Sequence, residues 1–233
     1  MKMLPYFVLL PLFLLLSSRA FSQNTNYYQG ISQEAFRNEK LCNDTLDFDT
    51  IDLPRLNALL FYMTNEIRAK HKLPVLEYAK ELEDAASMHS RDMVMKDFFS
   101  HDNPFDREKK TPNDRALVTG IKNPFIAENI AEEFGLQYKS GSNVVVLGKG
   151  RFSYEPEENL IPPKTYLMLA VSLLERWMNS PEHRKNILSP DALQIGCGTY
   201  FFTDSQFNDM PTFMATQNFQ WYEKIGRLQE KNK

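Results

Sequence analysis

The apolar residues of this chain follow a helical period in three segments and a strand period in the last third, and this change of period constrains the fold more than any other feature. The helical segments run from Asp52 to Pro74, from about Tyr78 to Asp97 and from about Thr165 to Asn179. In each segment, apolar side chains recur every three or four residues, as on one face of a helix. Asp52 followed by Pro54 is typical of a helix start. Three amphipathic helices are therefore expected.

A two-residue period marks two segments near the C-terminus, Ile195–Phe201 and Phe213–Phe219. The polar stretch Thr203–Pro211 lies between them, so we expect two strands joined by a loop. A Ser-Pro pair opens residues 180–188 and predicts a short helix there. Residues 99–127 contain three prolines and a glycine, and are expected to be mostly loop. Helices that pack on an antiparallel sheet in one layered unit give an α+β fold.

The N-terminus has the pattern of an export signal. Lys2 precedes an apolar run from Met3 to Leu16, and Ala20 and Ser22 fit a small-residue cleavage site. The run has 14 residues, which is fewer than the roughly 20 that a membrane-spanning helix needs. We therefore interpret residues 1–22 as a signal peptide, with an uncleaved anchor as the alternative. The protein is then exported, either secreted or periplasmic, with no integral membrane segment after cleavage.

The charge of the exported chain bears on its partners. Removal of Lys2 and Arg19 with the signal peptide leaves 25 basic and 30 acidic side chains, a net charge of −5. This sign disfavours nucleic acid and anionic membranes as partners. The expected partner is an unidentified extracellular or cell-envelope ligand, and no nucleic acid.

Cys42 and Cys197 are the two cysteines of the chain. In an oxidising compartment they could form a disulfide, and closing so long a loop would stabilise the fold by about 4–5 kcal/mol in the chain-entropy description. The alternative is that Cys197, which lies in an apolar segment, is a buried free thiol. The chain has no C-x-x-C motif, so a zinc site made of thiolates is excluded.

Most standard enzyme signatures are absent from the sequence. It has no G-x-S-x-G, no H-E-x-x-H and no Walker lysine loop, and both of its Gly-x-Gly pairs lack the third glycine of a dinucleotide site. What remains is a set of histidine and carboxylate positions. His101 follows a helix end, Glu128 precedes Asn129 after a proline-rich loop, and His183 lies in the first turns of the short helix.

These positions lie in segments that together resemble the CAP superfamily, which includes the cysteine-rich secretory proteins, antigen 5 and the pathogenesis-related 1 proteins, and especially its bacterial SCP-like branch. The resemblance covers about Leu56 to Tyr222. The segments that carry it are Phe98–Pro104, Glu128–Ile130, Trp177–Leu188 and Ile195–Gly198, together with Asn65, Arg68, Leu73–Leu76, Ala86–Met93, Thr111–Arg115 and Gln217–Phe219.

The resemblance implies a three-layer α-β-α sandwich with an antiparallel central sheet. It also implies a cleft lined by two histidines and two acids, which in eukaryotic members can hold a divalent metal. By motif, His101 and His183 are the two histidines and Glu128 is the first acid, whereas Ser180 stands where the family has its second acid. The candidate metal ligands are thus His101, His183 and Glu128, for zinc or copper. The alternative for Glu128 is a structural, buried carboxylate bonded to backbone N–H groups and to His101.

The domain organisation follows from the same comparison. Residues 23–51 are an N-terminal extension, 52–222 the CAP/SCP-like domain and 223–233 a polar tail. An insertion at about 135–164 contains a glycine-flanked, β-branched run that predicts an added strand or hairpin. It either rims the cleft or decorates the surface.

Two functions remain open for such a domain. The absence of an activated nucleophile and the missing second acid favour a secreted binding module, with or without a divalent metal. The alternative is a metal-dependent hydrolase, a peptidase or esterase, that uses His101, His183 and Glu128. We expect His89 to pack in the core, because it lies on the apolar face of its helix, and Arg115 to pair with local carboxylates or carbonyls.

Overall fold

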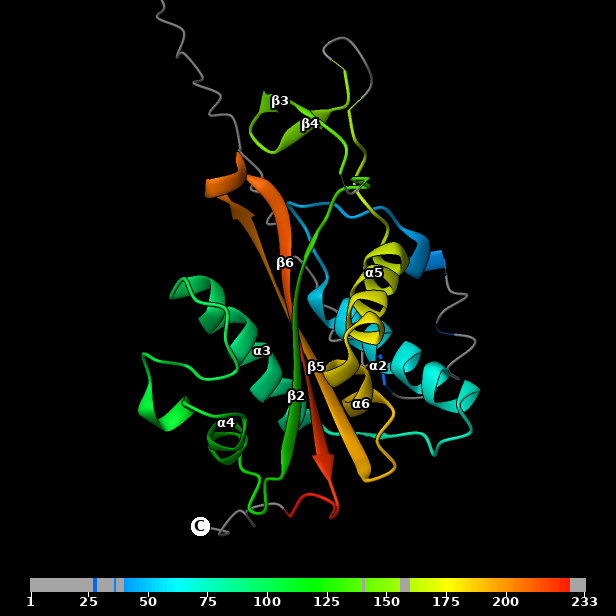
Figure 1. Cartoon of the computed structure of the whole chain (residues 1–233), viewed down its shortest axis with the longest axis vertical. Helices are drawn as coiled ribbons and strands as arrows, with labels where there is room; N and C mark the ends of the chain where they lie inside the picture. The colour runs from blue at the N-terminus through cyan, green and yellow to red at the C-terminus, as the bar shows by residue number, and fades with distance from the viewer. Residues whose placement is uncertain (1–26, 29–35, 37–39, 140, 156–159, 227–233) are drawn as a thin grey trace, which may run out of the picture.

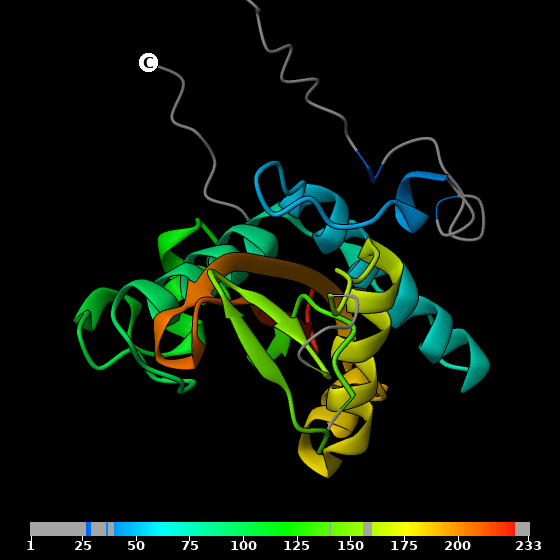
Figure 2. The ribbon, with the colours of Figure 1, turned by 90° about the horizontal axis from the view of Figure 1, so that it is seen from above.

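The computed structural model describes residues 27–28, 36, 40–139, 141–155 and 160–226. The predicted signal peptide, much of the N-terminal extension and the end of the polar tail lie outside the described residues. The described chain forms three layers, a sheet between two layers of helices, as Figures 1 and 2 show from two directions. The α+β class and the α-β-α sandwich are therefore confirmed.

The central sheet has four strands in the order β1-β5-β6-β2. The long strands β5 (Ala192–Asp204), β6 (Met210–Trp221) and β2 (Ile126–Phe134) are antiparallel. The two-residue strand β1 (Glu77–Tyr78) adds to β5 in the parallel direction. The strand β2 pairs with β6 on one side and forms an edge of this sheet, a position that matters for the site.

The helices cover the two faces of the sheet. One layer contains α2 (Leu53–Lys70), α5 (Tyr166–Asn179) and α6 (Pro181–Ile187), and the other contains α3 (Lys80–Met95) and α4 (Pro112–Val118), as Figure 2 shows. The described chain also contains short 3-10 helices: η1 (Lys40–Asn43), η2 (Arg107–Lys109) and η3 (Ser205–Phe207).

The first helix begins as the sequence predicts. The Asp52 side chain accepts a hydrogen bond from the N–H of Arg55, with Pro54 in the first turn. Such a cap satisfies one of the backbone donors left open at a helix start.

Two glycines of β5 allow α3 to approach the sheet closely. A Cβ atom on Gly196 would lie 2.0 Å from the backbone N of Glu83, and one on Gly198 would lie 2.1 Å from the backbone N of Ser87. Backbone atoms cannot move away cheaply from such contacts, so this crossing requires glycine. The Gly-x-Gly pair therefore serves helix–sheet packing, in agreement with its failure to match a dinucleotide motif.

The main hydrophobic core lies between the sheet and the layer of α2 and α5. Trp177 is fully buried there, as its place on the helical stripe predicts. Cys42 and Cys197 are both buried in this core as free thiols, which is the alternative to a disulfide. The described part of the N-terminal extension also packs on the domain, since the Tyr28 ring stacks on Tyr78 with centroids 3.6 Å apart.

Residues 99–127 are mostly loop, as expected, but they also include α4, which was not expected. The Thr111 side chain accepts from the N–H of Asp114, the Asp114 side chain accepts from the N–H of Thr111, and Pro112 occupies the first turn. This capping box starts a helix among prolines and polar residues. Glu128 follows this loop, as expected, and lies within β2.

The predicted insertion does contain a hairpin. Its strands are β3 (Val145–Gly148) and β4 (Arg151–Ser153), which pair with each other and stand at one end of the central sheet (Figure 1). The hairpin packs on a small separate core made of Leu136, Phe152, Ile161 and Met210.

Of the residues the structure describes, no helix combines the length and the apolar character needed to cross a bilayer.

Candidate functional site

Glu128 lies on β2 at the centre of a buried polar cluster. Its side chain is 1% exposed, and its Oε2 accepts a hydrogen bond from the Arg115 guanidinium at 2.7 Å. The Asn218 amide, in the orientation that satisfies its neighbours, donates to the same oxygen at 3.1 Å. A buried carboxylate needs such compensation, because its charge has lost the hydration of water.

The other oxygen of Glu128 faces two histidines. Its Oε1 lies 2.9 Å from Nδ1 of His101 and 3.6 Å from Nε2 of His89. Because a carboxylate only accepts hydrogen bonds, His101 donates through Nδ1, and in a neutral ring Nε2 then carries the lone pair. The His101 side chain is 49% exposed, so its imidazole is oriented at the inner nitrogen and accessible elsewhere.

His89 is a core residue, as its position on the apolar face of α3 predicts. It has no exposed surface, its Nε2 is 3.0 Å from the carbonyl oxygen of Ser100, and burial lowers its pKa to about 4. The nearby positive charge of Arg115 also lowers that pKa, whereas Glu128 raises it. His89 is therefore neutral at pH 7 and supports the loop that carries His101.

Arg115 does more than neutralise Glu128. It is fully buried and donates to the carbonyl oxygens of Lys109, Lys110 and His101, each at 3.0 Å. These bonds, together with the bond to Glu128, connect the His101 loop to α4 and β2. Arg115 therefore pairs with a local carboxylate and local carbonyls, as expected.

His183 lies across the edge of β2 from this cluster. The Asn129 amide donates to the His183 carbonyl at 3.2 Å, and the Asn186 amide donates to the Glu128 carbonyl at 3.3 Å, so α6 is held against the start of β2. His183 lines a recess of about 340 Å³, which we call the His183 recess. Its other lining residues are Phe99, Ile130, Ala131, Glu132, Arg176 and Ser180.

The two candidate histidines interact electrostatically. Burial lowers the pKa of His183, and the positive charge of His101 lowers it further. The part of the chain that the structure describes nevertheless contains no group of three or more His, Cys, Asp or Glu side chains arranged to hold a metal ion. Both oxygens of Glu128 are already engaged, so the carboxylate does not fit as a ligand, although it orients His101. Metal binding by His101 and His183 stays a prediction.

Glu132 is a site residue that the sequence did not reveal. It lies four residues after Glu128 on β2, and because side chains alternate along a strand, both project from the same face. Burial and the charge of Asp204 raise the pKa of Glu132. The alternation Glu128-x-Ile130-x-Glu132 was the available signal, but it is readable only once β2 is recognised as a strand.

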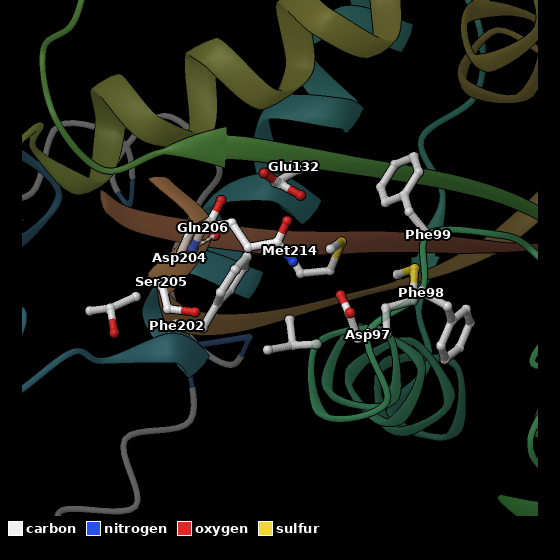
Figure 3. A pocket seen from close by; sticks show the side chains of 12 residues that line it. Asp97, Phe98, Phe99, Glu132, Phe202, Asp204, Ser205, Gln206 and Met214 are labelled. Atoms are coloured by element: carbon white, nitrogen blue, oxygen red, sulfur yellow. Dashed lines mark hydrogen bonds between the residues drawn. The ribbon is translucent and has the colours of Figure 1, made fainter. Parts of the chain in front are cut away.

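Glu132 also borders a larger hollow of about 560 Å³, the acidic cavity. Figure 3 shows Asp97, Glu132 and Asp204 around this cavity, with Phe99 and Phe202 on opposite sides and Met214 between them. The acidic cavity and the His183 recess share Phe99 and Glu132, so they adjoin along β2. No residue of β3 or β4 lines either hollow, so the hairpin does not form a rim of this site.

A layered α-β-α domain in which two histidines and a buried carboxylate lie beside an edge strand is a domain of the SCP class. The sequence matches the family described as CAP, Cysteine-rich secretory protein family, over residues 61–219. The chain belongs to this family and is a CAP/SCP-domain protein of the bacterial type.

Individual relatives share part of their length with this chain. The Uncharacterized protein YkwD of Bacillus subtilis (strain 168) is 29% identical over 136 residues, which are 58% of this chain and 39% of that protein. This chain thus spans well under half of that relative.

Two solved structures are also similar. An extracellular protein containing a SCP domain from Bacillus anthracis has 27% identity and a TM-score of 0.47, covering 71% of this chain and 40% of that one. An outer surface protein from Borrelia burgdorferi has 17% identity and a TM-score of 0.46, covering 73% of this chain and 96% of that one.

Proposed function

We propose that this protein is an exported binding module that takes an extended peptide with basic side chains along the outer edge of β2, beyond the Glu128 carbonyl to which Asn186 donates. The observation that carries the proposal is the position of that edge: Ile130, Ala131 and Glu132 of an edge strand line the recess that holds His183. An edge strand presents unpaired N–H and C=O groups, which an added strand can satisfy.

The charge of the acidic cavity supports a basic ligand. Asp97, Glu132 and Asp204 line it, and no lysine or arginine does so among the described residues. The adjoining His183 recess contains Arg176, whose guanidinium pairs with Glu133 at 3.1 Å. The raised pKa of Glu132 reflects a carboxylate that burial and a like charge disfavour. An incoming ammonium or guanidinium group relieves that repulsion.

The aromatic lining supports the same class of ligand. Phe98, Phe99 and Phe202 contribute to the acidic cavity, and Phe99 is 56% exposed. Aromatic faces attract cations and also cover the aliphatic stems of lysine and arginine side chains. Phe99 lies where the cavity meets the His183 recess, so it would contact a ligand that spans both.

The surroundings of Glu128 support binding without turnover. A general base must reach the proton that it abstracts, whereas the Glu128 carboxylate is buried and bonded to Arg115 and His101. Export is supported by the apolar N-terminal run with its small-residue cleavage site.

A divalent metal is the second candidate, and the orientation of His101 favours it. A histidine that metal ions bind commonly donates its other ring nitrogen to a carboxylate, as His101 does to Glu128. Zinc or copper bound by His101 and His183 would supply Lewis acidity, the requirement of the metal-dependent peptidase or esterase alternative.

The peptide proposal is tested with fluorescent peptides of equal length that are basic, neutral or acidic. We expect the purified mature chain to bind the basic peptide at least tenfold more tightly than the neutral one, with affinity that falls as salt rises. N-methylation of alternate amides should weaken binding further if the peptide pairs with β2. Equal affinity for all three peptides would contradict the proposal.

The metal alternative is tested separately, by titrating zinc and copper into the wild type and into His101→Ala and His183→Ala variants. Peptide and ester hydrolysis is measured in parallel, with and without chelator. If the protein only binds its ligand, no peptide or ester hydrolysis will depend on His101 and His183. Turnover that depends on metal and on both histidines would replace it with the hydrolase.

A further inference from the structure

The hairpin of the predicted insertion borders a third hollow, separate from the His183 recess. It has a volume of about 780 Å³, within the range of small-molecule sites. Three of its lining residues, Lys149, Gly150 and Arg151, belong to the β3–β4 hairpin, which stands at one end of the molecule (Figure 1). None of its lining residues belongs to the His183 recess, and Thr203 is shared with the acidic cavity. We call it the hairpin cavity.

The walls of the hairpin cavity are largely apolar. Phe48 comes from the N-terminal extension, Leu136 follows β2, and Pro211 lies at the start of β6. The remaining apolar wall is one continuous segment, Leu160–Pro163. An apolar ligand part that enters such a hollow leaves water, which is favourable in proportion to the area buried.

Bonds between the walls preform the cavity. The N–H of Gly150 donates to the Asn208 carbonyl at 3.2 Å, and a Cβ at Gly150 would lie 2.5 Å from the Asp209 carbonyl oxygen, so the hairpin turn is closely seated on the β5–β6 connection. The N–H of Ile161 donates to the Phe152 carbonyl at 2.7 Å, which ties the opposite wall to β4. Little reorganisation is then needed to admit a ligand.

Two cations stand on the hairpin turn at this apolar hollow. Lys149 and Arg151 both line the cavity and are both exposed. Asp209 is the one carboxylate among its described lining residues. Neither cation forms a salt bridge with a described residue, although the Arg151 guanidinium donates to the carbonyl oxygens of Leu147 at 3.3 Å and Gly148 at 3.4 Å. Lys149 also has a φ of 51°, a left-handed conformation that costs a lysine more than a glycine or asparagine. The turn thus carries a charged side chain where an uncharged Asn would fit the backbone better.

We propose that the hairpin cavity binds a single-chain amphiphile with an anionic head group, such as a long-chain carboxylate, as a monomer. The alkyl chain lies between Phe48, Leu136 and the Leu160–Pro163 segment, and the carboxylate meets Lys149 and Arg151. The residues that carry this proposal differ from those that carry the peptide proposal, although Thr203 lines both the hairpin cavity and the acidic cavity, so either proposal can fail without the other.

Calorimetric titration of the full mature chain with octanoate, decanoate and dodecanoate, below their micelle concentrations, tests the apolar part. We expect affinity to rise by up to about fourfold for each added methylene. Dodecylammonium, with the same chain and the opposite charge, should bind at least tenfold more weakly than dodecanoate. Affinity that does not depend on chain length, or a preference for dodecylammonium, would overturn the proposal.

Variants separate the two parts of the site. Lys149→Asn with Arg151→Gln should reduce dodecanoate affinity at least tenfold, and Lys149→Asn alone should not lower stability because it relieves the left-handed lysine. Leu160→Asp, at a residue that is 48% exposed, should also weaken binding. The matched controls Lys122→Asn and Leu117→Asp lie outside the cavity and should bind as the wild type does. Equal losses in the controls would refute the assignment.

Vesicles distinguish a monomer site from a membrane-binding surface. If the chain binds anionic vesicles but not monomeric dodecanoate, the hairpin is a membrane contact and the proposal is wrong. Monomer binding that the Lys149 and Arg151 substitutions reduce, with the fold intact by circular dichroism, supports it.

Discussion

Glu128 and Glu132 lie on the same strand and the same face, four residues apart, yet their surroundings differ in kind. Glu128 is buried beside Arg115, His101 and Asn218, which together engage both of its oxygens. Glu132 is partly exposed, and burial and the charge of Asp204 raise its pKa, although the charge of Arg176, which pairs with Glu133, acts to lower it. Glu128 is compensated by direct bonds, whereas no hydrogen bond or ion pair to the Glu132 carboxylate is found among the described residues.

The difference teaches which acid serves stability and which is available to a ligand. A compensated buried charge organises the loops around it, and removing it leaves its partner unpaired. An uncompensated acid at a cavity costs stability until a cation approaches it. We therefore assign Glu128 to the architecture of the site and Glu132 to recognition.

The largest expected effect is the loss of stability in Glu128→Gln. This change leaves the Arg115 guanidinium buried without a counter-charge, and we expect the free energy of unfolding to fall by about 3–5 kcal/mol. Urea denaturation at pH 7, followed by circular dichroism, measures it. A loss below about 1 kcal/mol would mean that the cluster does not hold the fold.

The second expectation concerns the coupling between Glu128 and Arg115. The double variant Glu128→Gln with Arg115→Gln should be more stable than the sum of the single losses predicts, by about 1–3 kcal/mol, because neither charge is then left alone. The same urea denaturation on four proteins gives this coupling energy. Strictly additive losses would show that the pair does not act as a unit.

The third expectation is a modest effect at His101. Its side chain is half exposed, so His101→Ala should cost about 1 kcal/mol of unfolding free energy, for the lost bond to Glu128. His183→Ala, which removes the other candidate histidine, serves as its comparison in the same thermal and urea unfolding assays. A loss at His101 as large as that of Glu128→Gln would make its ring part of the core.

The smallest effect has the opposite sign. Because the pKa of Glu132 is raised in the fold, its charged form is less favourable there than in the unfolded chain. Glu132→Gln should then stabilise the protein at pH 7 by up to about 0.5 kcal/mol. The gain should shrink as pH falls through the folded pKa, and vanish below the unfolded one, where wild-type Glu132 is protonated in both states. Urea denaturation at pH 7 and pH 3.5 measures both, and a gain that persists at the lower pH would contradict this cause.

The helices α2, α3 and α5 and the strands β5 and β6 were predictable, because their apolar periods extend over many residues. The helix α4 was not predicted, since a seven-residue helix among prolines depends on the cap at Thr111 rather than on a period. The parallel pairing of β1 depends on a contact with β5, far away in sequence, which no local pattern records.

The site was predictable as far as motifs carry it. The sequence named His101, Glu128 and His183, and offered a structural role for Glu128 bonded to backbone N–H groups and to His101. The bond to His101 is present, but the other described hydrogen-bond partners of the carboxylate are the Arg115 and Asn218 side chains instead of backbone N–H groups. The sequence did not identify Glu132, because no strand was expected over residues 126–134 and no motif contains that residue. The hairpin was expected from its β-branched run, but the cavity beneath it requires side chains from several segments that are distant in sequence.

The most direct test compares the affinity of the basic peptide for Glu132→Gln and for Glu128→Gln, measured by fluorescence anisotropy at a temperature where both remain folded. The assignment of the two acids predicts that Glu132→Gln weakens binding at least tenfold, while Glu128→Gln stays within threefold of the wild type. A tenfold loss in Glu128→Gln, with Glu132→Gln unchanged, would contradict it.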